Sequence, residues 1–299
     1  MSDQISYKDC PCCSSTNIFP VVTAKDYTVS GELFEIWHCK ACTARFTQHI
    51  PLADKIGAYY QSANYISHSD TQKGLVNRLY HIVRKLTLKS KRKLIEKNTL
   101  NGPGKIVEVG AGTGAFSQTM QEAGWEVIGI EPDASARELA YHKFGLSLHP
   151  AEKLFQLQPL TSDAITMWHV LEHVHDLKGY LRQFHAVLKK GGKLVIAVPN
   201  YTSYDAIKYG ACWAAYDVPR HLYHFSPKSM EMLGNASGFR LSSVKPMWFD
   251  SFYVAMLSEQ YKNGKTGLLA AVWNGLLSNF SAVLNTRKCS SVIYVFVKD

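Results

Sequence analysis

Three alternate glycines follow a short apolar run in the middle of the chain, and this turn constrains the fold more than any other feature. Residues 105–109 predict a buried strand, and residues 116–120 continue at helical spacing. Gly110, Gly112 and Gly114 therefore predict a strand-to-helix turn. Because glycine has no Cβ, a ligand can approach the backbone there, and the first N–H groups of the next helix can donate to it. The sequence thus predicts an α/β domain with a ligand-binding turn.

Two acidic residues indicate which ligand this turn accepts. Gly110-x-Gly112-x-x-Ala115 also fits a dinucleotide fingerprint, and Glu131 ends a second strand 21 residues after Gly110, where a carboxylate can accept both hydroxyls of a ribose. Glu108 distinguishes the alternatives, because its carboxylate would repel a pyrophosphate and attract an ammonium group. We therefore expect a nucleoside that carries an amino acid, not a dinucleotide.

From about residue 106 to residue 200 the chain resembles the class I S-adenosylmethionine-dependent methyltransferases. The resemblance includes the glycine motif at 108–114, Gly-Ile-Glu131-Pro-Asp, the segment 163–174 and the turn and strand at 188–199. It implies an α/β fold with a doubly wound, Rossmann-like, seven-stranded sheet and S-adenosylmethionine as cofactor. The cofactor-binding residues expected from the motifs, from the adenine-contacting turn and from the end of the fourth strand are Glu108, Gly110, Gly112, Gly114, Glu131, Ala151, Glu152, Trp168 and His169.

Two histidines are candidates for the general base. His169 follows the fourth strand and is expected to be neutral near pH 7, so it is either a base or a hydrogen-bonded wall residue. His221 lies in an insertion, Asp-Val-Pro-Arg-His-Leu, in which Arg220 offers a fork for a carboxylate or phosphate or else forms a bridge to an aspartate. Glu172 and His173 resemble part of the ubiquinone-pathway O-methyltransferases. There we expect helix packing and a local hydrogen bond in preference to a divalent metal.

Paired cysteines near the N-terminus predict a metal site. C-x2-C, a 25-residue gap and a second C-x2-C supply four thiolates, which suit a closed tetrahedral zinc ion, and the hooks resemble a zinc ribbon. Cys12 is a bystander of this spacing, and unligated reduced cysteines are the alternative. The predicted ligands are Cys10, Cys13, Cys39 and Cys42.

The chain divides into three predicted parts. Residues 1–50 form a zinc-ribbon-like domain, residues 51–103 a connector with a basic amphipathic helix, and residues 104–299 the S-adenosylmethionine-dependent methyltransferase domain. The connector carries Tyr59, Tyr60, Tyr65 and His68, which either cover the ligand sites or pack between domains. Nine basic residues and one acid lie between Lys73 and Lys97, within a net charge of +9. This helix is either a solvated face or a surface for an anionic partner, such as RNA, an acidic lipid surface or an acidic carrier protein.

Residues 266–286 carry no charge and place large apolar side chains on one helical face. Polar residues opposite argue against a transmembrane span, so we expect this face to pack on the domain or to form a homodimer. No secretory signal is visible, and the odd number of cysteines, seven, suits a reducing compartment, which predicts a cytoplasmic protein.

These features predict an enzyme that transfers a methyl group from S-adenosylmethionine to an oxygen, carbon or nitrogen of a small-molecule acceptor. The fusion of a four-cysteine module to the domain resembles sugar C-methyltransferases, which implies a sugar, glycan precursor or other secondary metabolite, and the basic helix is compatible with an anionic acceptor. Two alternatives stay open: an RNA methyltransferase that uses the basic helix and the zinc module, and a non-catalytic scaffold that binds the cofactor.

Overall fold

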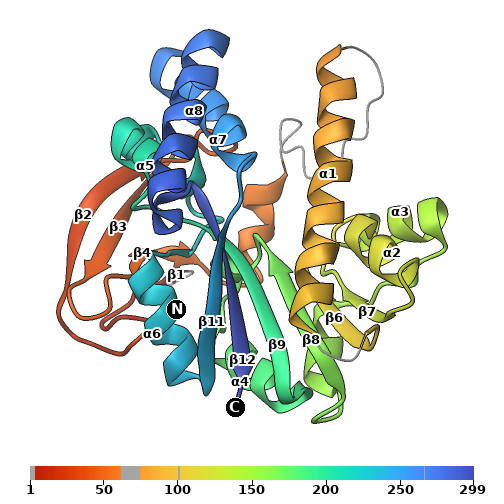
Figure 1. Ribbon diagram of the computed structural model, residues 1–299. Coiled ribbons are helices and arrows are strands. Elements are labelled where there is room, and N and C mark those ends of the chain that lie inside the picture. The colour runs from red at the N-terminus through yellow and green to blue at the C-terminus, as the bar shows by residue number, and fades with distance from the viewer. Residues whose placement is uncertain (1–3, 62–74, 100–101, 266) are drawn as a thin grey trace.

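The structure, a computed structural model, describes residues 4–61, 75–99, 102–265 and 267–299 (Figure 1). Tyr65, His68 and Lys73, which figured in the sequence predictions, lie outside these ranges.

A six-stranded sheet forms the centre of the molecule, in the order β11-β12-β9-β8-β6-β7. Its parallel strands are β6 (Lys105–Val109), β7 (Glu126–Ile130), β8 (Ser162–Trp168) and β9 (Leu188–Pro199). Strand β12 (Ser291–Lys298) runs antiparallel to both β9 and β11 (Phe239–Pro246). The predicted third strand is reduced to a single bridge between His149 and Ile130, so the expectation of seven full strands is corrected to six.

Helices cover both faces of this sheet, as its alternating apolar side chains require. On one face, α1 (Leu75–Asn98) and α2 (Ala115–Gln121) pack through Ile95, Phe116 and Met120 onto Ile106, Val195 and Ile293. On the other, α4 (Leu177–Val187) and α6 (Pro227–Ala236) pack through Phe184 and Met230 onto Val107, Ile165 and Leu194. Helix α3 (Ala134–Phe144) lies next to α2 at the β7 side (Figure 1).

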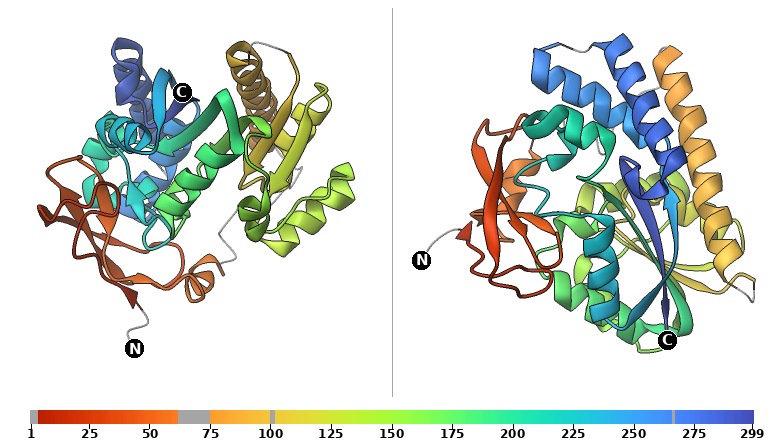
Figure 2. Two further views of the ribbon diagram at one scale, coloured as in Figure 1. Left: turned by 90° about the horizontal axis from the view of Figure 1, so that it is seen from below. Right: turned by 60° about the vertical axis from the view of Figure 1, so that its left-hand side comes forward.

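The N-terminal residues form a second, four-stranded sheet in the order β10-β4-β3-β2. Strands β2 (Ile18–Lys25), β3 (Leu33–Cys39) and β4 (Arg45–Thr47) come from the cysteine-rich region, whereas β10 (Tyr223–His224) comes from the insertion after β9. Phe46 and Ile50 share one hydrophobic cluster with the central sheet, and β1 (Gln4–Ile5) pairs with β5 (Ile50–Pro51). Figure 2 shows this sheet against one side of the larger domain. The predicted boundary at residue 50 stays a prediction, but the pairing of β10 with β4 crosses it.

Three helices complete the C-terminal half: α5 (Tyr204–Tyr209), α7 (Asp250–Asn263) and α8 (Leu268–Leu284). Helix α8 packs on its neighbours through small and polar residues, among them Ala271, Gly275 and Ser278, while Leu269 is 90% exposed and Trp273 64% exposed. The expectation that the large apolar face packs on the domain is therefore wrong, and the homodimer stays a prediction. Among the described residues, no helix has both the length and the apolar composition needed to cross a bilayer. Short 3₁₀ helices occur at Ile56–Tyr60 (η1), Ala151–Gln156 (η2), Leu171–His173 (η3), Gly210–Cys212 (η4), Ala214–Tyr216 (η5) and Thr286–Lys288 (η6).

Candidate active site

The glycine turn between β6 and α2 has the form that the sequence predicts. Gly110, Gly112 and Gly114 all have positive φ, at 74°, 54° and 77°. A Cβ on Gly110 would lie 2.2 Å from Cγ2 of Val170, whereas a Cβ on Gly112 would meet no heavy atom within 4 Å. The first glycine is thus required for packing, and the second leaves backbone open to a ligand, as a cofactor cradle requires.

Glu131 is fixed at the end of β7 beside this turn. One carboxylate oxygen accepts a hydrogen bond from the backbone N of Gly112 at 2.7 Å, and the other accepts from the N of Asp133 at 3.0 Å. Ala151 and Glu152 open the 3₁₀ turn that follows the bridge of His149 to β7, so they lie on the same edge of the sheet. The predicted ribose-binding acid and the predicted adenine turn are therefore neighbours.

Glu108 is buried within β6 and accepts a hydrogen bond from Ser117 Oγ at 2.5 Å. Burial raises the pKa of this carboxyl to about 7, although the Ser117 hydrogen bond and the charge of Lys91 partly oppose the rise. An arriving ammonium group would favour the ionised form. This acid is thus poised to respond to a cationic ligand, as its predicted role requires.

Lys91 reaches this site from α1, and sequence reasoning did not single it out. Its Nζ lies 4.3 Å from the centre of the Trp168 ring, a cation–π contact. Burial lowers the pKa of Lys91 to about 8, and the charges of Glu108 and Asp250 hold it from falling further. Phe116 of α2 packs edge-on against the ring of Trp168. Trp168, predicted at the cofactor site, therefore contacts both Lys91 and the helix that follows the glycine turn.

His169 follows Trp168 with φ of 57° and forms a charged pair with a residue far along the chain. Its Nε2 lies 2.7 Å from Oδ2 of Asp250, the first residue of α7. Burial disfavours the charged ring, but attraction to Asp250 and Glu172 outweighs burial and raises the pKa of His169 to about 10. The ring is therefore an imidazolium near pH 7, where the sequence interpretation expected a neutral one.

A groove of about 340 Å³ adjoins this pair and separates α1 from the segment that joins β11 to α7. Its apolar lining includes Met247, Trp248 and Ile293. Four lysines line it as well, and Asp250 stands at its edge. The lysines are Lys91, Lys93, Lys97 and Lys245. Three basic residues of α1 thus line a cavity, which their sequence pattern alone could not show.

The second predicted base, His221, lies apart from this groove and against η3. Its Nδ1 lies 2.8 Å from the carbonyl oxygen of Ala215, and its ring packs at 4.6 Å, centre to centre, on the ring of His173. Glu172 separates the two predicted bases, since its Oε1 lies 3.3 Å from His169 Nδ1 and its carboxylate is also near His173 and His221. Glu172 thus lies close to both His169 and His221.

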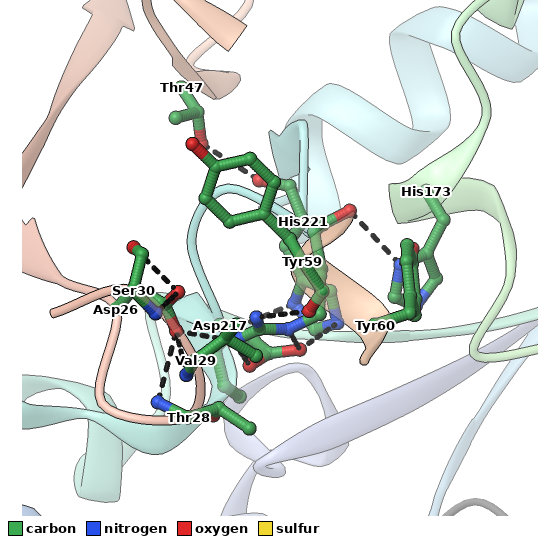
Figure 3. A network of polar contacts seen from close by, with 12 residues as sticks. Asp26, Thr28, Val29, Ser30, Thr47, Tyr59, Tyr60, His173, Asp217 and His221 are labelled. Atoms are coloured by element: carbon green, nitrogen blue, oxygen red, sulfur yellow. Dashed lines mark hydrogen bonds and ion pairs between the residues drawn. The ribbon is translucent and has the colours of Figure 1, made fainter. Parts of the chain in front are cut away.

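Arg220 does not offer its fork to a ligand. It is 1% exposed, and it donates to Asp217 through Nε and Nη2, to Asp26 through Nη2 at 2.9 Å and to the carbonyl oxygen of Tyr59 through Nη1. Asp26 also accepts from the backbone of residues 28–30, as Figure 3 shows. The alternative of an arginine–aspartate bridge is the one observed, and it ties the hairpin between β2 and β3 to the insertion.

The four predicted zinc ligands converge. Cys10 Sγ lies 3.6 Å from Cys42 Sγ, Cys13 Sγ lies 3.6 Å from Cys39 Sγ, and all four sulfurs lie within 4.8 Å of one another. A tetrahedral zinc ion with Zn–S bonds of about 2.3 Å separates its sulfurs by about 3.8 Å, so the thiols fit this ion. Both hooks close in the same way, because the residue after each second cysteine, Ser14 or Thr43, has φ near 60°.

Comparisons with known proteins agree with this geometry. A family model described as "Methyltransferase domain" matches residues 80–244, more than half of the chain. The mitochondrial ubiquinone biosynthesis O-methyltransferase of Rattus norvegicus is 25% identical over 182 residues, and these cover 53% of this chain and 52% of the rat protein. The ubiquinone biosynthesis O-methyltransferase of Aeromonas salmonicida is 27% identical over 179 residues, covering 54% and 71%. The chain thus spans about half the length of the rat relative.

A solved structure shares the fold. The crystal structure of a SAM-dependent methyltransferase from Thermotoga maritima superimposes with a TM-score of 0.50 at 19% identity, covering 75% of this chain and 96% of that one. At this identity the likeness concerns the fold alone.

Proposed function

Because the chain belongs to the methyltransferase-domain family, we propose that it transfers a methyl group from S-adenosylmethionine to a small-molecule acceptor that carries an anionic group. The anionic group of the acceptor is inferred from the lysine-lined groove. One of its lysines, Lys91, contacts Trp168, and Asp250 lies at its edge. The named relatives act in ubiquinone biosynthesis, which favours a small molecule over RNA as the acceptor.

The residues around the glycine turn would hold the cofactor. Glu131 is fixed by two backbone N–H groups and can accept the ribose hydroxyls, Glu108 can pair with the ammonium of the amino acid, and the open backbone at Gly112 admits the chain between them. S-adenosylmethionine supplies an activated methyl group on a sulfonium. The protein's own contribution is then chiefly to align the acceptor with it and to keep water away.

The acceptor would lie in the groove, its apolar body on Met247, Trp248 and Ile293 and its anionic group against the lysines. In the transfer, the methyl–sulfur bond breaks with its electron pair left on sulfur, the acceptor atom forms the new bond, and a protonated acceptor atom also loses its proton. His169 already holds a proton and pairs with Asp250, so we assign it to orienting an anionic group. Proton removal by His221 stays a prediction.

Calorimetric titration with S-adenosylhomocysteine and with NAD tests the cofactor. We expect micromolar binding of the first alone, its loss in Glu131→Ala and its retention in Glu122→Ala, which alters an exposed acid of the same domain. Binding of NAD instead would overturn the proposal, because a dinucleotide places its pyrophosphate beside Glu108.

Acceptor class is tested with methyl-labelled S-adenosylmethionine and matched pairs of small molecules, such as a dihydroxybenzoate and its neutral amide, or a sugar phosphate and the sugar. We expect label in the anionic member of at least one pair, and Lys245→Glu should raise KM with little change in kcat, since Lys245 is an exposed residue of the groove. Transfer to neutral members alone, or to RNA alone, would refute the anionic small-molecule acceptor.

A further inference from the structure

A second cluster of metal-ligating side chains lies outside the cysteine site and outside the lysine groove. Glu172 and His173 come from η3, after β8, and His221 comes from the insertion after β9. One ligand atom from each residue lies within 4.8 Å of the others. Segments almost fifty residues apart thus bring two imidazoles and one carboxylate to one place, where both rings and Tyr60 can be followed in Figure 3.

Both rings hold their Nδ1 atom against a backbone carbonyl oxygen. His221 Nδ1 lies 2.8 Å from the carbonyl oxygen of Ala215, and His173 Nδ1 lies 3.0 Å from the carbonyl oxygen of Arg220. A carbonyl can only accept, so the contact with Ala215 places a proton on His221 Nδ1 and leaves a lone pair on its Nε2. His173 Nδ1 lies 3.0 Å from the hydroxyl of Tyr60 as well, and a hydroxyl can donate or accept. Metal-bound histidines usually have this arrangement, because the hydrogen bond from the far nitrogen fixes the tautomer and the ring plane.

The carboxylate of Glu172 lacks the partners that burial demands. Its side chain is fully buried, and within the described part of the chain neither oxygen accepts a hydrogen bond. The charged ring of His169 lies 3.3 Å from Oε1, which leaves Oε2 without even that contact. Of the two residues for which the sequence predicted a local hydrogen bond, His173 forms one through its ring, whereas the carboxylate of Glu172 does not. A buried carboxylate is unfavourable by several kcal/mol unless cations or donors surround it, and the His169 ring adjoins Oε1 alone.

Asp217, the acid nearest to the His221 ring, does not hydrogen-bond to its Nε2 atom. Asp217 Oδ2 lies 4.0 Å from His221 Nε2, beyond hydrogen-bond distance, and both oxygens of Asp217 accept from Arg220. Two imidazoles and one carboxylate are a donor set suited to divalent first-row transition metals, and three protein ligands leave coordination positions for water or another oxygen ligand.

We propose that Glu172, His173 and His221 bind one divalent transition-metal ion through nitrogen and oxygen donors, separately from the four-cysteine zinc site. The ion would use the Nε2 lone pair of His221, so it would exclude that ring from proton transfer. The metal would also join η3 to the insertion, two segments already linked by the hydrogen bond from Leu222 N to Glu172 O at 2.7 Å. The site does not depend on the identity of the methyl acceptor.

Titration of the zinc-loaded, full-length chain with Mn²⁺, followed by the EPR signal of free Mn²⁺, tests this proposal. Manganese is chosen because it favours nitrogen and oxygen ligands over the thiolates of the first site. We expect one Mn²⁺ bound per chain, and affinity at least tenfold weaker in Glu172→Gln and in His221→Gln. The matched control is Glu138→Gln with His142→Gln, an exposed Glu–His pair on α3 that should not change the titration.

Two readouts keep the test independent of whether a variant folds. Zinc content and S-adenosylhomocysteine binding report the fold of each variant, and pulsed EPR of Mn²⁺ on the unaltered chain should show nitrogen coupling from imidazole ligands. No stoichiometric binding at millimolar Mn²⁺, no nitrogen coupling, or equal loss in the α3 control would each overturn the site. Loss of methyl transfer with Mn²⁺ binding intact would instead concern the proposed function alone.

Discussion

Replacement of Arg220 by methionine should destabilise the protein far more than the loss of an exposed charge would. The guanidinium is 1% exposed and lies 2.9 Å from Asp26 and 2.6 Å from Asp217. Asp26 is itself 1% exposed, so Arg220→Met leaves a buried carboxylate without its cation. Methionine preserves most of the apolar stem, which limits the change to the charge and its hydrogen bonds.

The size of the effect follows from what remains around Asp26. Removal of one partner from a buried ion pair typically costs about 3–5 kcal/mol. The backbone N–H groups of residues 28–30 and the hydroxyl of Ser30 still donate to the Asp26 carboxylate, which places the expected loss near the lower end, at about 3 kcal/mol. Asp217 is partly exposed, so water can replace its share of the bonds.

Urea unfolding of the zinc-loaded chain, followed by circular dichroism and tryptophan fluorescence, measures this loss. The matched control is Arg240→Met, which breaks an exposed pair with Asp299 and should cost less than about 1 kcal/mol. A loss for Arg220→Met no greater than that of Arg240→Met would refute the claim that this ion pair ties the hairpin between β2 and β3 to the insertion. Asp26→Asn in the Arg220→Met background should recover part of the loss, because it removes the orphaned charge.

Three further predictions address the cofactor and the zinc. Gly110→Ala should abolish S-adenosylhomocysteine binding and destabilise the fold by more than about 1 kcal/mol, since φ is positive and the new Cβ would collide with Val170; calorimetry and urea unfolding measure both. Burial raises the pKa of Glu108 to about 7, so its anion is present above that pH and lost below it. S-adenosylhomocysteine affinity should therefore fall as pH drops from about 8 to about 6. Glu108→Gln should flatten this profile, and an equally steep profile in the variant would contradict the assignment. Cys39→Ser should lower bound zinc to well below one ion per chain and expose the N-terminal sheet to limited proteolysis, whereas Cys12→Ser should do neither, as metal analysis and mass spectrometry of the fragments will show.

Local patterns in the sequence were sufficient to predict most strands of the central sheet and the glycine turn. The run before Gly110 became β6, the acid at the end of the next strand became the anchored Glu131, and the cysteine hooks converged as their spacing required. In each case the signal and the structure involve residues close in sequence, or a spacing fixed by a metal. Such features can be predicted from the sequence because the local backbone geometry needs those residue types.

Lys91 and Asp250 could not be found in this way. Lys91 is one of eight basic residues in a helix whose pattern shows only which face is apolar, and its contact with Trp168 depends on how α1 crosses the sheet. Asp250 lies 81 residues from His169, and nothing near either residue in the sequence indicates their pairing. The charge state of His169, which follows from that pairing, was therefore out of reach as well.

Helix α8 shows how an amphipathic pattern can mislead. Periodicity identified two faces correctly, and the usual rule buries the one with the larger apolar residues. Here the close approach of α7 requires small residues instead: a Cβ on Gly275 would lie 2.5 Å from the Phe252 ring, and Ser278 donates to the buried Asp205. Close packing and a buried carboxylate thus decided which face turned inward, and the large side chains were left outside.

The cysteine hooks contact the methyltransferase domain directly. Thr43, at the end of the second hook, hydrogen-bonds to Ser226 and accepts from Tyr201, and Thr47 of β4 donates to the carbonyl oxygen of His221 at 2.8 Å. The strand that contains Thr47 is also paired with β10, two residues beyond His221. The second hook is therefore linked to the segment that carries His221 through β4 and β10. A zinc ion bound by the four cysteines would thus stabilise the small sheet with which the insertion is paired.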